Sequence, residues 1–260
     1  CVMPTRNARN ALAFTDSIAS PSAAGRAVAR ALQAFGGLDI VVNNAAILRD
    51  GFIFKSDPGD FEAVIRNNLS AAYYVLAAAA PVMRDQAKAN RGGAPYAWGR
   101  IVNVTSSAAL YGNFGQSAYA SAKAGLLGLT RAVAQDMSRS AVTCNALVPF
   151  ASTRVTESIR PANEAQAQYK ARGLKVAPRH VATVIAWLCS PAGQDVTGQV
   201  IGVRGREVFL FAQMRPLIRL ARTDGDWDVP ALAAAATAQF APRYTDLGTD
   251  LEHFNTEPFV

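Results

Sequence analysis

Short runs rich in valine and isoleucine alternate along this chain with longer alanine-rich stretches. The short runs are apolar at every position, which is typical of parallel strands buried on both faces. The longer stretches repeat apolar residues at helical spacing. Strands that alternate with helices predict a parallel sheet with right-handed crossovers. We therefore expect an α/β fold, a Rossmann-like doubly wound sheet in a single domain.

The predicted elements extend from residue 11 to residue 203. Predicted strands are Ala11–Phe14, Leu38–Val42, Arg100–Thr105, Val142–Val148 and Gly198–Val203, and predicted helices are Ser22–Phe35, Asp60–Met83, a helix containing Tyr119 that ends near Ser138, and Arg179–Cys189. The polar segment Ala151–Gly173 is helix-tending and long enough to act as a lid. The tail from about residue 207 to residue 260 extends past the last predicted strand.

Composition and charge narrow the classes of function. The 260 residues are 50% hydrophobic with a net charge of +7, and their basic residues are scattered rather than interleaved with aromatics. We therefore expect no nucleic-acid partner. The apolar runs are too interrupted to predict a membrane span. The three cysteines show no metal-ligand spacing and favour a reducing compartment, so we expect a cytoplasmic protein without a metal.

Polar residues follow four of the predicted strands. Asp16 follows the first strand, Asn43 the second, Ser106 the third, and the segment from Pro149 to Thr153 the fourth. Ligands of open parallel sheets bind at the carboxyl ends of the strands. This convergence predicts a binding site at that edge.

Tyr119 and Lys123 are four residues apart and share one face of the predicted helix. A phenol ionises near pH 10, and a neighbouring ammonium group favours the phenolate and lowers its pKa. A serine at the preceding strand end could hold a substrate oxygen beside this phenol. The alternative is that Tyr119 and Lys123 are ordinary neighbours on a helix surface.

Taken together, these motifs resemble the short-chain dehydrogenase/reductase family over about residues 11–203. The matching stretches are N-N-A-A at 43–46, the asparagine Asn68 in R-N-N-L, Ser106 thirteen residues before Tyr119, Y-x-x-x-K at 119–123, N-A-L-V-P at 145–149 and V-T-G-Q-V-I-G-V at 196–203. N-N-A-A-I-L-R-D and S-S-A-A-L-Y-G-N-F-G-Q-S-A-Y are closer to the (3R)-hydroxyacyl-CoA dehydrogenase module of peroxisomal multifunctional enzymes and its bacterial relatives. An extended tail also suits this subgroup.

The resemblance implies roles for individual residues. Ser106 would bond the substrate oxygen, with Ser107 as its rival, and Tyr119 would transfer the proton as general acid or base. Lys123 would lower the pKa of the tyrosine and hold the nicotinamide ribose, and Asn68 would fix a water molecule that links the lysine to solvent. The family resemblance also places cofactor contacts at Asp16, Asn43, Ala45, Tyr119, Lys123, Pro149 and Thr153.

The implied activity is the interconversion of a secondary alcohol and a ketone with NAD or NADP, of which NAD is favoured. The substrate is expected to be a 3-hydroxyacyl/3-oxoacyl thioester of lipid metabolism, such as an acyl-CoA. The alternatives are a hydroxysteroid or another bulky alcohol, or a cofactor-free scaffold of the same fold. By resemblance, the helices that carry Asn68 and Tyr119 would pair in a homodimer or homotetramer.

The start of the sequence departs most from the family pattern. The family opens with a strand, a glycine-rich turn that cradles phosphates, a helix and a second strand, and this first β-α-β segment is absent here. Without it, strands would keep unpaired backbone groups inside the core. We therefore expect the natural polypeptide to carry further residues before Cys1, and its intact mass tests this. Arg204–Gly205–Arg206 also departs, because it replaces an acidic D-G-G ending.

Overall fold

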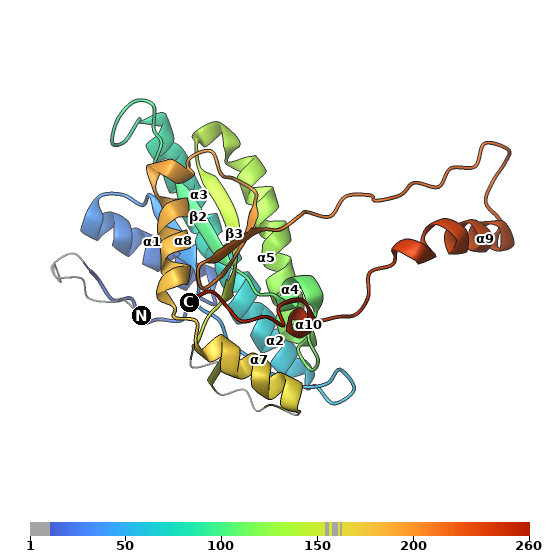
Figure 1. Cartoon of the computed structure of the whole chain (residues 1–260). Helices are drawn as coiled ribbons and strands as arrows, with labels where there is room; N and C mark the ends of the chain where they lie inside the picture. The colour runs from blue at the N-terminus through green and yellow to red at the C-terminus, as the bar shows by residue number, and fades with distance from the viewer. Residues whose placement is uncertain (1–10, 154–155, 158–160, 162) are drawn as a thin grey trace.

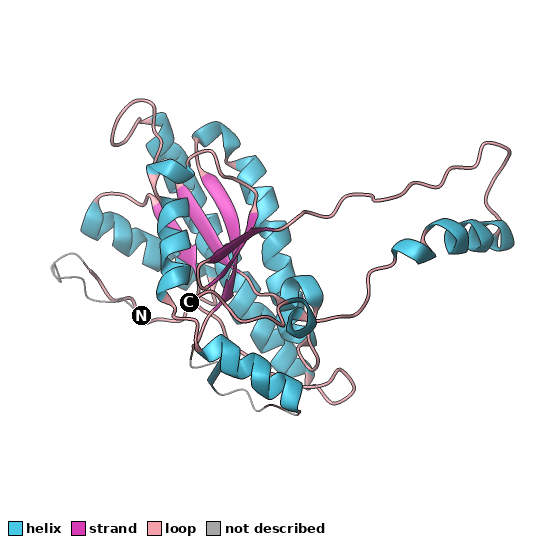
Figure 2. Ribbon diagram, in the orientation of Figure 1, coloured by secondary structure: helices cyan, strands magenta, loops and turns pink. Residues whose placement is uncertain are grey.

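A computed structural model describes residues 11–153, 156–157, 161 and 163–260 of the chain. Its sheet has five strands in the order β1-β2-β3-β4-β5, seen as magenta arrows in Figure 2. The strands are β1 Ile40–Asn43, β2 Arg100–Val104, β3 Thr143–Phe150, β4 Val200–Arg204 and β5 Glu207–Leu210. The first four are parallel, and β5 runs antiparallel to β4. The predicted α/β fold in a single domain is confirmed, and β5 is an addition that the sequence patterns did not predict.

Helices cover both faces of this sheet (Figure 1). The longer ones are α1 Pro21–Phe35, α2 Pro58–Ile65, α3 Ala71–Lys88, α5 Ser117–Asp136, α7 Glu164–Leu174, α8 Arg179–Cys189 and α9 Val229–Gln239, and two single turns are α4 Ala108–Tyr111 and α10 Asp250–His253. The one helix predicted at 60–83 is α2 and α3 joined by a π-turn, η2 Arg66–Ser70. Parts of the predicted lid, residues 154–155, 158–160 and 162, lie outside the described residues, as do residues 1–10.

Side chains that alternate along β2 and β3 build two cores. Ile101 and Cys144 point into the cluster formed with α1, α3 and α5, where Cys144 is fully buried. Val102 and Leu147 point to the opposite face and pack against α8. This alternation is the two-residue period of a strand, and it fixes which strand ends face which helix.

The predicted strand Ala11–Phe14 is wrong, because these residues are irregular in the structure. Within the described residues, β1 is an edge strand that pairs only with β2. Its Ile40 and Val42 are 46% and 39% exposed, although their apolar character suits a buried strand. A strand needs a hydrogen-bonded neighbour to satisfy its backbone, and residues 11–14 have no ladder to join.

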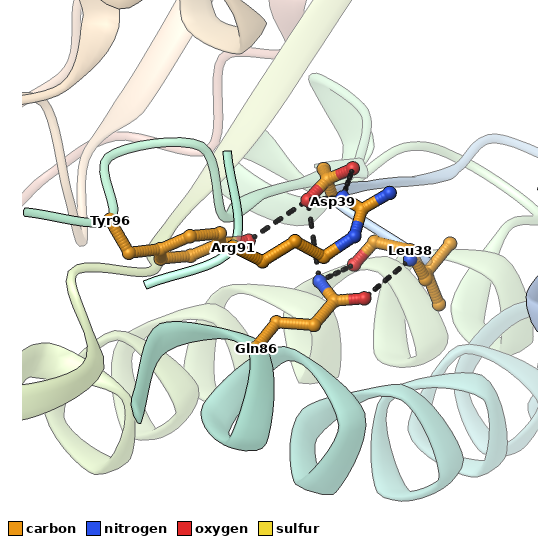
Figure 3. A network of polar contacts seen from close by, with 5 residues as sticks. All are labelled: Leu38, Asp39, Gln86, Arg91 and Tyr96. Atoms are coloured by element: carbon orange, nitrogen blue, oxygen red, sulfur yellow. Dashed lines mark hydrogen bonds and ion pairs between the residues drawn. The ribbon is translucent and has the colours of Figure 1, made fainter. Parts of the chain in front are cut away.

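A polar network of five residues fixes the segment that leads into the amino end of β1 (Figure 3). Gln86 of α3 accepts a hydrogen bond from the Leu38 amide at 2.8 Å and donates to the Leu38 carbonyl at 2.9 Å. The Asp39 carboxylate accepts hydrogen bonds from the Arg91 guanidinium at 2.6 Å and from the Tyr96 hydroxyl at 3.2 Å. The network joins α3 and the loop after it to the start of β1, so it belongs to the fold rather than to the site.

The tail leaves the body after β5 and forms a long arm before it returns (Figure 1). The arm, residues 212–247, carries α9 and exposes several large apolar side chains, including Met214 at 92% and Leu247 at 94%. The chain then comes back to the body, where α10 lies beside α4 (Figure 1). No helix within the described residues is long and apolar enough to cross a membrane.

Candidate active site

The end of β2 and the start of α5 bring Ser106 and Tyr119 together. The Thr105 hydroxyl donates to the Lys123 carbonyl at 2.8 Å, which ties α5 to the end of β2. The Ser106 hydroxyl acts on the Tyr119 phenol as a hydrogen-bonding group and lowers its pKa. Ser106 also accepts from the Ala108 amide at 3.2 Å, so the first turn of α4 holds the serine side chain in place.

Burial is the largest influence on the Tyr119 phenol and raises its pKa. Ser106 lowers that pKa, and the nearby Asp50 carboxylate raises it, so the net direction is upward. The prediction that Lys123 sets the direction downward is therefore wrong for this structure. A raised pKa keeps the phenol protonated at neutral pH, which suits a proton donor.

Lys123 lies one turn after Tyr119 and is buried to 2% exposure. Its Nζ donates to the Val104 carbonyl at 2.7 Å and lies 5.7 Å from the centre of the Tyr119 ring. Burial lowers the pKa of Lys123 to about 8. The lysine is thus directed at the end of β2, and only one of its three N–H donors is used by this bond.

Asn68 lies in the π-turn between α2 and α3 and is also 2% exposed. Its amide accepts from the Ile47 N–H and donates to the Ile47 carbonyl, both at 2.8 Å. π-turns often occur at functional sites because they redirect a side chain within a helix. Here the side chain clamps the loop that follows β1.

Four of the predicted residues line one small cavity. Its volume is about 70 Å³, and Asn43, Ala45, Asn68 and Lys123 are all in its wall. The Asn43 amide donates to Asn103 of β2 at 2.8 Å, which joins the ends of the two neighbouring strands. The carboxyl ends of β1 and β2 therefore meet as the strand-end argument predicts.

The other predicted cofactor contacts lie apart from this cavity. Asp16 pairs with Arg26 at 2.7 Å and lines a separate, open cleft of about 420 Å³ beside α1. Pro149 is half-buried in β3, and the exposed Thr153 hydroxyl is 3.2 Å from that of Thr156. All seven predicted cofactor contacts, those in the cavity wall included, stay predictions.

The structure separates the two rival serines. Ser107 donates to the Asp250 carboxylate at 2.5 Å, whereas Ser106 acts on Tyr119. Tyr169 of α7 donates to the same Asp250 oxygen at 3.0 Å. Asp250 and Tyr169 were missed at the sequence level, because 143 residues separate Ser107 from Asp250 and no spacing pattern connects them.

The motifs matched Ser106, Tyr119, Lys123 and Asn68 as one set. The structure places the buried Lys123 one turn after Tyr119 and the buried Asn68 in the π-turn before α3. A family model described as enoyl-(acyl carrier protein) reductase matches residues 5–205. The chain belongs to the short-chain dehydrogenase/reductase family. Members of this family are oxidoreductases that use NAD(P)H, so the chain carries the fold and sequence of such an enzyme.

Three of its relatives in the short-chain dehydrogenase/reductase family have names that describe an activity. The hydroxyacyl-CoA dehydrogenase ChsB1 of Mycobacterium tuberculosis is 36% identical over 90% of this chain and 72% of its own length. The 3-oxoacyl-[acyl-carrier-protein] reductase FabG of Thermotoga maritima is 36% identical over 68% of the chain and 69% of its own. The peroxisomal multifunctional enzyme type 2 of Drosophila melanogaster is 37% identical over 65% of the chain but only 25% of its own.

A crystal structure of a short-chain dehydrogenase from Mycobacterium avium has the same fold. It superimposes with a TM-score of 0.74 at 33% identity, over 88% of this chain and 74% of that one. The sequence and structure comparisons thus agree on the short-chain dehydrogenase/reductase family.

The residues present fit the nicotinamide half of the family's cofactor. Lys123 keeps two N–H donors beyond its bond to Val104, and Asn43 and Ala45 lie in the wall of the same cavity. An ammonium group suits the hydroxyls of a ribose, and small side chains such as Ala45 leave room for a ring. Within the described residues, no glycine-rich turn lies at a strand end to cradle the phosphates.

Proposed function

We propose that this protein interconverts a secondary alcohol and a ketone on a 3-hydroxyacyl/3-oxoacyl thioester, with Ser106, Tyr119, Lys123 and Asn68 as its catalytic residues. The observation that carries the proposal is the buried Lys123, whose Nζ lies 5.7 Å from the centre of the Tyr119 ring, with Ser106 acting on the same phenol. The names of the relatives support the substrate class, since one is a hydroxyacyl-CoA dehydrogenase and another a 3-oxoacyl reductase.

The mechanism follows from the protonation states of these side chains. In ketone reduction, Ser106 donates a hydrogen bond to the carbonyl oxygen, and the protonated Tyr119 delivers the proton that the oxygen needs as it becomes an alcohol. The nicotinamide supplies or accepts the hydride when bound. Lys123 holds the ribose and offers positive charge beside the phenol as it loses its proton, while Asn68 keeps the loop after β1 in place.

Substitution of Tyr119 tests the proposed acid. Tyr119→Phe removes only the hydroxyl, so we expect kcat to fall by about a hundredfold to ten-thousandfold while the Kd for the nicotinamide stays unchanged. The reduction of 3-oxobutanoyl-CoA by full-length protein, followed through NADH absorbance, measures kcat. A titration followed through nicotinamide fluorescence measures the Kd.

Tyr244→Phe is the matched control, because Tyr244 is an exposed tyrosine in the tail, 70% accessible to solvent. It should retain wild-type turnover. A Tyr119→Phe enzyme that keeps more than about a tenth of wild-type kcat would show that another group supplies the proton.

The same assays also test the two alternatives to this proposed function. A hydroxysteroid or another bulky alcohol would replace the thioester if full-length protein with NADH or NADPH turned over only those compounds. A scaffold role would be favoured if neither nicotinamide bound. Four site residues brought together favour an enzyme over a scaffold, and we propose NAD ahead of NADP.

We propose further that residues 1–260 form one short-chain-dehydrogenase domain with an extension from about residue 207. We also propose a cytoplasmic location and a homodimer or homotetramer. Exposed apolar side chains support assembly, among them Phe61 on α2 and Tyr73 on α3, at 45% and 55% exposure. Size-exclusion chromatography with light scattering tests the assembly.

A further inference from the structure

The returning tail packs onto the edge of the sheet that carries the candidate site. Phe254 is buried against Phe150 at the end of β3, with ring centres 4.5 Å apart, and against Phe209 of β5 at 5.3 Å. Tyr111 of α4 lies 4.8 Å from the His253 ring. This aromatic contact places residues 249–257, hereafter the tail strap, directly beside the turn that follows Ser106.

The hairpin between β4 and β5 anchors the strap from the other side. Arg204 is buried, and its guanidinium donates to the Thr256 hydroxyl at 2.9 Å and to the Thr256 carbonyl. The Arg206 amide donates to the Phe259 carbonyl at 2.7 Å. The departure from an acidic D-G-G ending at 204–206 thus has a structural role, because Arg204 binds the tail strap and Arg206 binds the residues just after it.

Within the strap, one carboxylate joins two parts of the site. Asp250 is half-buried and accepts from Ser107 at 2.5 Å and from Tyr169 at 3.0 Å on the same oxygen. Ser107 is the neighbour of Ser106, and Tyr169 belongs to α7, the helical part of the segment that follows β3. Burial and the Asp250 charge both raise the pKa of Tyr169, so its phenol remains a donor.

Other contacts link α7 to the same strap. Arg172 donates to the Asn255 side chain, and Lys175 pairs with Glu257 at 2.7 Å. The Lys175–Glu257 pair is exposed to solvent and contributes little on its own. The half-buried Asp250 bonds are the stronger connection, because charge-assisted bonds exceed neutral ones and are weakly screened when buried.

We infer that Asp250 is a positioning residue, which fixes the turn after Ser106 through Ser107 and helix α7, a part of the predicted lid, through Tyr169. The tail strap thereby sets the distance between the reacting end of the substrate and the segment that covers its apolar part. This inference rests on the proposed function, since it assigns the apolar part to an acyl chain.

The two hydrogen bonds of Asp250 are separable by mutation. Ser107→Ala frees the Ser106 turn alone, so kcat for 3-oxodecanoyl-CoA falls about tenfold while KM stays within about twofold. Tyr169→Phe frees α7 alone, so KM rises about tenfold while kcat stays within about twofold. Asp250→Ala produces both effects, and Ser107→Ala adds no further loss of kcat to it, because the two residues act through one bond.

Two variants distinguish positioning from general stability. Asp250→Asn keeps an amide oxygen that accepts from both hydroxyls, so it should restore kcat and KM to within about threefold of wild type. Asp246→Asn is the matched control, since this exposed carboxylate of the tail accepts from the Gly248 amide and approaches His253 at 3.9 Å, away from Ser107 and Tyr169. An Asp250→Ala enzyme with wild-type kcat and KM, or an Asp250→Asn enzyme as impaired as Asp250→Ala, overturns the inference.

Hydrogen exchange separates this inference from the proposed function. If wild-type protein reduces neither 3-oxobutanoyl-CoA nor 3-oxodecanoyl-CoA, the proposed substrate is wrong, and exchange then decides the role of Asp250. Asp250→Ala should raise exchange in peptides covering 106–112 and 164–174, while Asp246→Asn leaves them unchanged. Unchanged exchange in both peptides of Asp250→Ala overturns the positioning role.

Discussion

The ammonium group of Lys123 is buried inside the protein. This burial lowers the free energy of unfolding by an amount that depends on pH. The pKa of Lys123 falls from 10.5 to about 8 through burial. Between these two values the unfolded chain binds more protons than the folded chain, so the free energy of unfolding rises with pH across that window. Below about pH 8 the buried lysine is charged, and the full destabilisation is present. Above pH 10.5 the lysine is neutral in both the folded and the unfolded chain, so the destabilisation is absent.

Lys123→Met removes this titration and keeps the length of the side chain. We expect wild type to gain about 2 kcal/mol of stability relative to the variant between pH 7 and pH 10. Urea unfolding at unit steps of pH measures the difference. Lys88→Met is the control, because Lys88 is exposed near the end of α3 and should show no such gain. Parallel pH profiles for wild type and Lys123→Met would contradict the lowered pKa.

At the residue scale, the sequence indicates the pairing of Ser106 with Tyr119 but not their protonation. It was the family resemblance that matched the two residues, through their thirteen-residue interval. The pKa of Tyr119 depends on how much protein covers the ring and on Asp50, which lies on a different loop. Burial of this kind comes from the whole packing, so a helical i,i+4 spacing alone gave the wrong direction.

At the scale of elements, Gln86 connects α3 to the segment that leads into β1. Gln86→Ala leaves the amide and the carbonyl of Leu38 without their partners and removes a bond to Asp39. We expect a loss of about 2 kcal/mol in the free energy of unfolding, because part-buried backbone groups would be left unpaired. Thermal and urea unfolding measure it.

Gln135→Ala on α5 is the control for this change. Gln135 is exposed near the end of its helix, so alanine there should alter stability by less than about 0.5 kcal/mol. Equal stabilities of Gln86→Ala and Gln135→Ala would show that solvent satisfies the Leu38 groups.

Hydrophobic periodicity was sufficient to predict the buried helices and the central strands. It failed where the formation of a strand depends on a hydrogen-bonded neighbour. The stretch Ala11–Phe14 has strand composition, but no described strand offers it a partner. β5 has the alternating burial of an edge strand, yet it exists because Gly205, with a φ of +60°, allows the chain to turn back along β4. The π-turn at 66–70 leaves no mark in the hydrophobic pattern, because it changes the helix by only one hydrogen-bond step.

At the scale of the whole molecule, the arm extends away from the body and carries α9 with it (Figure 1). α9 has eleven residues, and isolated helices of that length are marginal in water. We expect trypsin to cut first after Arg219, which is exposed in the arm, before it cuts after the buried Arg204. Arg215 is followed by Pro216 and should resist.

Mass spectrometry of early fragments identifies the first cut. Ligands that bind the body should leave its rate unchanged, since the arm opens independently of the sheet. A first cut within the sheet or α5 would show that the arm is protected by contacts of its own, such as those of an assembled oligomer.

The bond between Ser107 and Asp250 also has a consequence for folding during synthesis on the ribosome. Its two ends are 143 residues apart, so at about 5–20 residues per second the ribosome needs on the order of ten seconds to make the second after the first. Tyr119 and the strands β3, β4 and β5 are made during that interval, so the sheet is complete before Asp250 is synthesised, and the serine turn still waits for its carboxylate. A chain released early would fold its sheet and still lack a finished substrate cleft.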